Sequence, residues 1–189
     1  MATPRKTFVI RRAEQLAALS SPVRCRIVES LSVHGPSSVR EIASRVDRLP
    51  ESLYYHVRAL VDVGIVLQRG KRKVGRRSEA VYRLVAPRLV IDPKQRSRAY
   101  LEALTGTCAA VLRLAERNYR TSVDRGGFTL SGAKRSLLVR RCTARLDRAG
   151  LTELNQLLDR VADLLEEHED SKSSDTYALT IVLTQLADG

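Results

Sequence analysis

The sequence predicts an α+β protein with three parts: a basic arm, a region of short helices and a β-hairpin, and a long helix followed by a strand–helix–strand unit. Three observations predict it. Residues 41–66 have the apolar spacing of two short packed helices, residues 65–85 alternate as a hairpin with a basic tip, and residues 93–122 carry apolar side chains at helical spacing. The expected boundaries of the three parts are 1–12, 13–90 and 91–189.

The net charge of +12 lies entirely in the first half of the chain. Residues 1–98 hold 21 Lys and Arg against 8 Asp and Glu, a balance of +13, whereas residues 99–189 hold 12 against 13, a balance of −1. A merely solvated basic surface would not divide in this way, so the pattern favours nucleic acid as a partner. No apolar run approaches the ~18 residues that a transmembrane helix requires.

The three cysteines, Cys25, Cys108 and Cys142, lie far apart in the sequence. Their odd number and the lack of paired spacing argue against a disulfide framework and favour a reducing compartment. The basic amino-terminal stretch also lacks the apolar core of a signal peptide. We therefore expect a cytoplasmic protein that associates with the nucleoid when it is bound.

The sequence of residues 1–35 predicts a basic arm followed by two helices. Residues 1–12 form the arm, and Phe8–Ile10 are candidates for docking on the next part of the chain. The first helix covers residues 12–19. The second begins at Ser21-Pro22, a capping residue followed by a proline in the first turn, and ends at Gly35. Its apolar face, at intervals of four residues, predicts a helix that supports the next pair from behind.

Residues 41–66 predict two helices joined by a tight turn. Ser38 and Glu41 fit a capping box before the first helix, Pro50 opens the second, and Gly64 closes it. The inward positions are apolar: Ile42, Val46, Leu53, Val57 and Leu60. Polar side chains occupy the outer face of the second helix. This pattern indicates a helix-turn-helix whose second helix, residues 50–63, enters the major groove of DNA.

Residues 65–85 predict a hairpin directly after this pair. Its basic tip carries five cations: Lys71, Arg72, Lys73, Arg76 and Arg77. Such groups neutralise phosphates and release counterions. A solvated hairpin tip is the alternative, because charge runs are usually solvated. The position directly after the helix pair favours DNA contact.

Residues 16–85 resemble the winged helix-turn-helix domains of ArsR-type regulators. The resemblance rests on four stretches: LSSPVR at 19–24, EIA at 41–43, PESLYYHVRAL at 50–60 and GIV at 64–66. The chain departs from the family in the turn, with Asp47 where Gly is frequent and Leu49 where a capping Ser or Thr is frequent. The resemblance implies a recognition helix in the major groove and a wing on the backbone or in the minor groove.

The resemblance also implies which side chains of residues 50–63 face DNA: Ser52, Tyr54, Tyr55 and Arg58. Arg58 is suited to a bidentate guanine contact or to phosphate, and Ser52 to phosphate near the helix N-terminus. The two tyrosines offer hydroxyls to phosphate and ring edges to thymine methyl groups. Packing beneath the wing is an equal alternative for Tyr54. For His56 a structural role is favoured over base reading.

We expect no metal site within the chain, no cofactor and no enzymatic activity. Metal-sensing members of that family use paired cysteines or His/Asp clusters, but Cys25 has no partner at ligand spacing and His34, His56 and His168 are scattered. A site assembled across a dimer remains open. The sequence contains no G-x-S-x-G, no H-E-x-x-H and no phosphate-binding glycine loop.

A long helix is predicted from Asp92-Pro93 to about Ser122. Its apolar residues are spaced 3-4-3-4 and form a seam suited to pairing with a second subunit: Leu101, Leu104, Cys108, Val111 and Ala115. Two-fold DNA sites favour such homodimers. Packing of the helix against the chain's own first part is the alternative.

The last part of the chain alternates between strand and helix patterns. A strand is predicted in residues 137–146, an amphipathic helix in 151–169 and a second strand in 177–186. The unit is open to three roles: sensing an unspecified effector, binding a partner, or completing the dimer.

Two functions fit these patterns. The first is a homodimeric, sequence-specific transcriptional regulator that binds double-stranded DNA. The alternative is a winged-helix nucleoprotein or protein-interaction module that binds DNA or RNA non-specifically.

Overall fold

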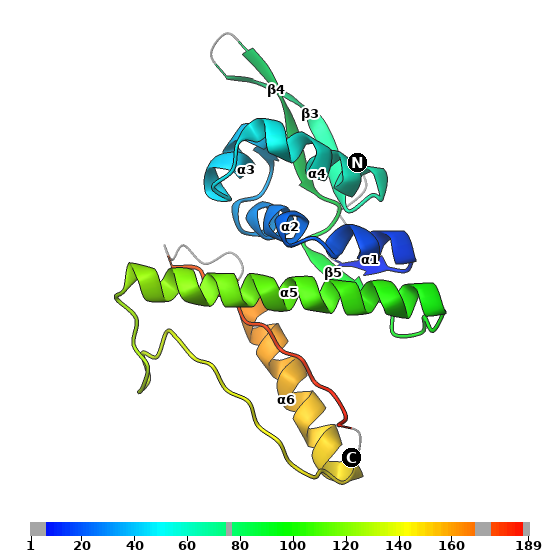
Figure 1. Cartoon of the computed structure of the whole chain (residues 1–189), viewed down its shortest axis with the longest axis vertical. Coiled ribbons are helices and arrows are strands. Elements are labelled where there is room, and N and C mark those ends of the chain that lie inside the picture. Colours follow the sequence, from blue (N-terminus) through cyan, green and yellow to red (C-terminus); the bar gives the residue numbers. More distant parts are fainter. Residues whose placement is uncertain (1–6, 75–76, 169–174, 187–189) are drawn as a thin grey trace. The chain divides into compact units, whose positions relative to one another are not determined.

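The computed structural model describes residues 7–74, 77–168 and 175–186. It divides into two compact units, one of residues 1–118 and 179–189 and one of residues 119–178. The elements of the first unit are β1 (Thr7–Ile10), α1 (Ala13–Leu19), α2 (Pro22–His34), β2 (Ser37–Ser38), α3 (Val39–Arg45), α4 (Pro50–Asp62), β3 (Val66–Val74), β4 (Arg77–Leu84), β5 (Arg88–Ile91) and most of α5 (Arg98–Arg125) (Figure 1). The second unit contains the end of α5 and α6 (Arg148–Glu167).

The α3–α4 pair packs as its apolar spacing predicts. The five inward residues expected from the sequence are all buried: Ile42, Val46, Leu53, Val57 and Leu60. They join one core cluster with residues of α1, α2 and β3, so α2 supports the pair from behind. Ala43 is also buried, at 1% exposure, in α3.

Both predicted helix ends are confirmed by hydrogen bonds. The Ser38 N–H donates to Glu41 Oε2 at 2.7 Å, and the Glu41 N–H donates to Ser38 Oγ at 3.4 Å, which completes the capping box of α3. At the end of α4 the Ile65 N–H donates to the Leu60 carbonyl at 3.0 Å, and Gly64 has φ +77°. This left-handed glycine closes α4 as a Schellman motif.

Gln15 connects α1 to the end of α4 by a hydrogen bond. Its amide nitrogen donates to the Val63 carbonyl at 3.2 Å, and the Arg12 guanidinium donates to the same oxygen at 2.9 Å. Gln15 is itself buried, and its carbonyl accepts from the Arg11 and Arg12 N–H groups. A buried amide with these partners is satisfied and holds the C-terminal end of α4 in place.

The predicted hairpin is present as β3 and β4, which pair antiparallel. The register runs from Val66 opposite Leu84 to Val74 opposite Arg77, with an irregularity between Gln68 and Lys71. β2 pairs with the other edge of β4, so the sheet order is β2-β4-β3. The hairpin projects beyond α3 and α4 in Figure 1.

Residues 7–10, within the expected arm, form an ordered strand. β1 pairs in parallel with β5, from Thr7 opposite Arg88 to Ile10 opposite Ile91, and Ile10 is buried. β5 lies between the hairpin and α5 in the sequence. Residues 1–6 of the arm lie outside the described residues.

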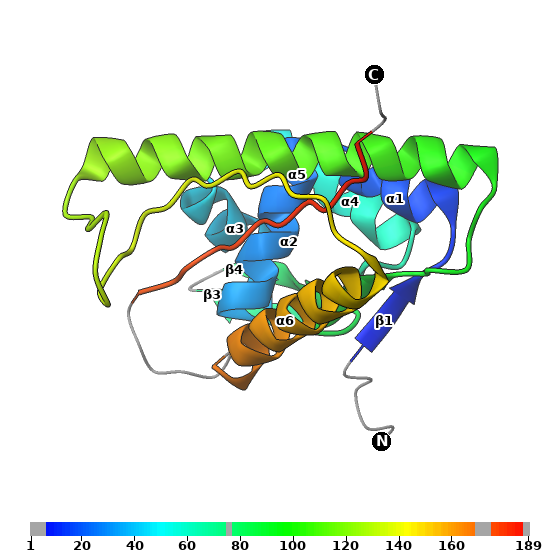
Figure 2. The same cartoon turned by 90° about the horizontal axis from the view of Figure 1, so that it is seen from below.

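The first half of α5 packs on α1 and β1. The Tyr100 hydroxyl donates to the Ile10 carbonyl at 2.8 Å, and the Thr107 hydroxyl donates to the Leu16 carbonyl at 2.9 Å. Both side chains are buried. Figures 1 and 2 show the first part of α5 beside α1. Gly106 lies so close to Ser20 that an added Cβ would be 2.8 Å from its hydroxyl, so this small residue serves packing within the chain.

The strand–helix–strand prediction is wrong in its two strands. The helix is present as α6, but residues 137–146 and 177–186 carry no strand within the described part of the chain. Alternation of apolar side chains only places those side chains on one face of an extended segment. A strand also needs a neighbour for its backbone N–H and C=O groups, and neither segment has a paired strand among the described residues.

Candidate nucleic-acid interface

The outer face of α4 presents the four helix residues that the sequence predicted for DNA contact. Ser52, Tyr54, Tyr55 and Arg58 are all exposed, with Tyr55 at 73% and Tyr54 at 54%. Large aromatic side chains on an exposed helix face are well suited to contacts with a partner. The Ser52 hydroxyl donates to the Leu49 carbonyl at 2.8 Å, so its donor is used within the first turn while its oxygen can still accept.

The turn before α4 is built around a left-handed aspartate. Asp47 has φ +51°, and it is the only non-glycine residue with positive φ among those described. The Arg48 N–H donates to the Ala43 carbonyl at 3.0 Å and stabilises the turn. Aspartate tolerates this conformation better than most side chains, so the turn forms without the glycine that is frequent in the family it resembles.

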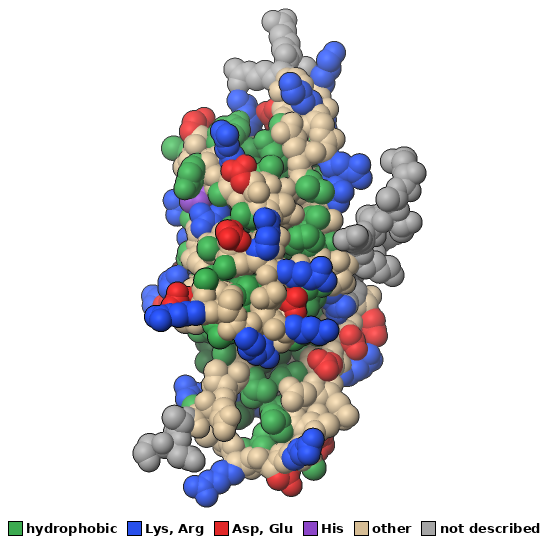
Figure 3. All heavy atoms as spheres, turned by 90° about the vertical axis from the view of Figure 1, so that its right-hand side faces the viewer, with side chains coloured by type: hydrophobic (Ala, Val, Ile, Leu, Met, Phe, Trp, Pro, Cys, Tyr) green, Lys and Arg blue, Asp and Glu red, His purple; other side chains and the backbone are tan. Residues whose placement is uncertain are grey.

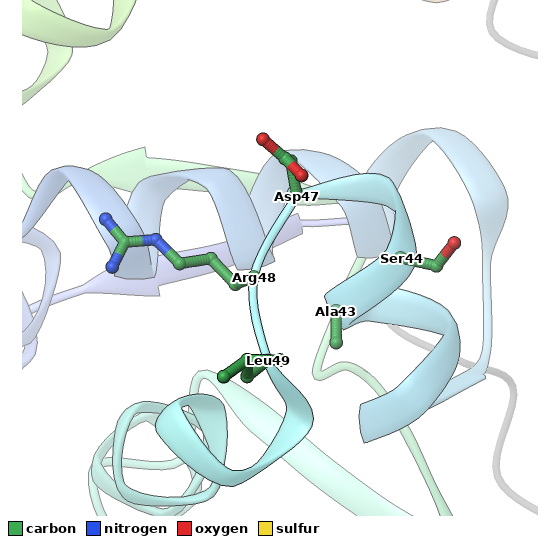
Figure 4. A pocket seen from close by; sticks show the side chains of 5 residues that line it. All are labelled: Ala43, Ser44, Asp47, Arg48 and Leu49. Carbon is green, nitrogen blue, oxygen red and sulfur yellow. The ribbon is translucent and has the colours of Figure 1, made fainter.

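A shallow pocket of about 420 Å³ lies at this turn, lined by Ala43, Ser44, Asp47, Arg48 and Leu49 (Figure 4). All except Ala43 are exposed. This pocket is not among the sites predicted from the sequence. Its only sequence signal was the pair of departures at Asp47 and Leu49.

The hairpin is tied to α3 by two ion pairs. Arg72 Nη2 lies 2.5 Å from Glu41 Oε1, and Arg40 Nε lies 3.2 Å from Glu79 Oε1. Glu41 also caps α3, so one carboxylate joins the helix cap to the strand. These contacts fix the hairpin beside the α3–α4 pair.

The predicted tip cations do not share one environment. Lys71, Arg72 and Lys73 are exposed on β3, and Arg72 is the member paired with Glu41. Arg76 lies outside the described residues, and Arg77 begins β4. Lys71 lines a pocket together with Tyr54 of α4.

That second pocket, of about 300 Å³, lies between α3, α4 and the hairpin. Its walls include Arg40, Tyr54, Lys71 and Tyr82. Burial raises the pKa of the Tyr82 hydroxyl, and the nearby Tyr54 raises it further. Tyr54 thus borders the hairpin and is exposed at the same time, so both roles considered for it are compatible with its position.

Hydrogen bonding holds the Glu41 carboxylate in its charged form. The Ser38 N–H lowers the pKa of Glu41 most, burial opposes this shift, and Arg72 and Arg45 lower the pKa further. The carboxylate therefore stays ionised wherever the ion pair with Arg72 is intact.

The surroundings of His56 are partly buried and carry positive charge. The residue is half-buried on α4, and its Nδ1 is buried without a hydrogen-bond partner among the described residues. Burial lowers the pKa of His56, and the positive charges of Arg24 and Arg48 lower it further. The Tyr55 ring meets the imidazole edge-on, with 5.6 Å between centroids.

The five residues predicted for a dimer seam differ in their exposure. Leu104 packs against the core of its own unit, Leu101 is 42% exposed, and Cys108, Val111 and Ala115 are half-buried. The face of α5 that is buried comprises Tyr100, Thr107 and Ala110. An apolar edge containing Leu101 and the exposed Leu112 therefore lies beside the buried face.

Three further properties concern the part of the chain that the structure describes. No three His, Cys, Asp or Glu side chains among them gather as a metal-ligand group. None of their helices combines the length and apolarity needed to cross a membrane. On the face drawn in Figure 3, Lys and Arg side chains outnumber Asp and Glu.

The α3–α4 pair, with α2 packed behind it, has the arrangement of a helix-turn-helix domain. Residues 19–69 match the family described as helix-turn-helix domain. The match begins at the end of α1, covers α2, α3 and α4, and ends in β3. No curated protein matches the chain. A helix-turn-helix domain implies DNA binding and indicates a DNA-binding regulator; such domains are typically not enzymes.

Proposed function

We propose that the protein is a sequence-specific transcriptional regulator of the winged helix-turn-helix type, similar to ArsR-type regulators without metal sensing. In this proposal α4 enters the major groove, and the β3–β4 hairpin acts as a wing on the backbone or in the minor groove. The observation that carries the proposal is the matched helix-turn-helix whose exposed α4 face stands beside a basic hairpin.

Charge and geometry support both contacts. The exposed Arg58 and the two tyrosines give α4 a donor and aromatic edges for base pairs, while Lys71 and Lys73 give the hairpin cations for phosphate. The ion pairs join the hairpin to α3, the helix that packs on α4, which favours simultaneous contact of both surfaces with one duplex.

We further propose that the protein acts as a homodimer in the cytoplasm, associated with the nucleoid. The apolar edge of α5 at Leu101 and Leu112 supports this, because exposed leucines along one edge of a helix are suited to the same helix of a second subunit. A dimer would present two copies of α4 to a two-fold DNA site.

The alternative is a module that binds DNA or RNA without sequence preference. The basic hairpin would serve that role equally well, since phosphate contacts carry no sequence information. A selection from random duplexes by the full chain, repeated at low and high salt, decides between the two. A palindromic consensus that persists at high salt supports the regulator, whereas steep salt loss without a consensus contradicts it.

A further inference from the structure

Leu49 is an exposed apolar side chain at the point where α4 begins. It is the N-cap residue of α4, makes no side-chain cap hydrogen bond, and is 73% exposed. Ser, Thr, Asp and Asn are preferred at this position because their side chains accept from the first helical N–H groups. The leucine side chain therefore accepts no capping hydrogen bond, and its apolar surface is exposed to water.

We propose that Leu49, together with the pocket at the α3–α4 turn, is a base-reading site that receives the 5-methyl group of a thymine. This inference rests on the proposed function, because it requires α4 to lie in the major groove. It adds a contact that the resemblance does not supply, since the family frequently has a capping Ser or Thr at this position.

The chemistry of the major groove selects the ligand. Among the groups that base pairs present there, the thymine methyl is the apolar one, and the others are hydrogen-bond donors and acceptors. In helix-turn-helix proteins, the N-terminal residues of the recognition helix contact base edges. Leu49 offers no donor or acceptor in its side chain, so a methyl group is the partner that its surface fits.

The residues that line the pocket favour contact with a base over contact with the phosphate backbone of DNA. The Asp47 carboxylate and the Arg48 guanidinium both line it, so the pocket has no net charge that would select a phosphate. Figure 4 shows the Leu49 and Arg48 side chains extending to the same side of the turn, so an apolar and a cationic group are presented together. Arg48 can neutralise a neighbouring phosphate while Leu49 covers the methyl group.

Replacement of thymine by uracil tests the contact, because it removes only the methyl group. Starting from the duplex chosen by the random-duplex selection, each thymine is changed in turn and the affinity of the full chain is measured. We expect a loss of about fourfold at one position in each half-site, the effect of one buried methyl-sized group. Leu49→Ser should remove this difference between thymine and uracil while it supplies the missing cap and raises the thermal stability.

Val33→Ser provides the matched control. Val33 is another exposed apolar residue, at the far end of α2, and its replacement should leave the thymine-to-uracil ratio unchanged. If wild-type protein selects a consensus but no uracil substitution changes its affinity, the inference is overturned and the proposed function stands. If Leu49→Ser keeps the full ratio, the methyl contact belongs to another side chain and the inference is equally overturned. If no consensus is selected, the proposed function fails and the inference falls with it.

Discussion

Arg72 on β3 and Glu41 on α3 form an ion pair, with 2.5 Å between Nη2 and Oε1. The same carboxylate accepts from the Ser38 N–H and so caps α3. The first helix of the helix-turn-helix and the hairpin therefore share one charged group. Among the tip cations whose surroundings are described, Arg72 is therefore already paired with a carboxylate.

The first prediction concerns the salt dependence of DNA binding. Lys71→Ala should flatten the slope of log affinity against log salt by about 0.9, the value for one lost phosphate contact. Arg72→Ala should flatten it less, because Glu41 already balances much of the Arg72 charge. Binding titrations at several salt concentrations measure both slopes. Equal changes for the two variants would contradict the role of the ion pair.

The second prediction is a pH dependence of stability through Glu41. Its pKa in the folded chain lies below the ordinary value of 4.5, so its stabilising contribution is fully present above that ordinary value. The contribution is lost as the pH falls through the lower, folded value. Thermal unfolding from neutral pH to about pH 3 should therefore show wild type losing its advantage over Glu41→Gln in this window. A constant difference between the two proteins would show that the charge of Glu41 does not stabilise the fold.

The third prediction tests base reading by Arg58. Arg58→Ala should weaken binding to the selected duplex by roughly 1–3 kcal/mol and relax the preference at one base pair. Arg113→Ala, at an exposed position on α5, is the matched control and should change neither property. Selection with each variant measures the preference. An unchanged consensus for Arg58→Ala would leave this residue only a phosphate contact.

The fourth prediction concerns the left-handed residue of the turn. Asp47 has φ +51°, a region in which a Cβ atom is strained and glycine is not. Asp47→Ala should therefore be less stable than Asp47→Gly by about 1 kcal/mol. Urea unfolding of the two variants measures the difference. Equal stabilities would mean that the turn relaxes to another conformation.

The fifth prediction separates dimerisation from folding. Leu101→Lys should give a folded monomer by light scattering, because Leu101 lies on the exposed edge of α5. Leu104→Asp should also lower the melting temperature, since Leu104 packs against the core of its own unit. A Leu101→Lys protein that remains dimeric would place the subunit interface elsewhere.

Features set by neighbouring residues could be predicted from the sequence. The apolar spacing of residues 41–66 determined which side chains of α3 and α4 are buried, because a helix repeats every 3.6 residues. The Ser38–Glu41 cap and the Gly64 end were predictable for the same reason: each depends on residues within one helical turn. The exposed face of α4, with Tyr55 and Arg58, follows directly from that periodicity.

Features that join distant segments were decided by the tertiary structure. The pairing of β1 with β5, the Arg72–Glu41 ion pair and the inward position of Leu104 each join segments far apart in sequence, and local periodicity carries no information about them. Residues 137–146 show the converse, because alternation predicted a strand where no partner strand is present among the described residues. The sequence by itself determined a helix-turn-helix with a basic hairpin. Only the tertiary structure decided which hairpin cation is already paired and how the turn at Asp47 leaves Leu49 exposed, since both depend on where the folded backbone places those side chains.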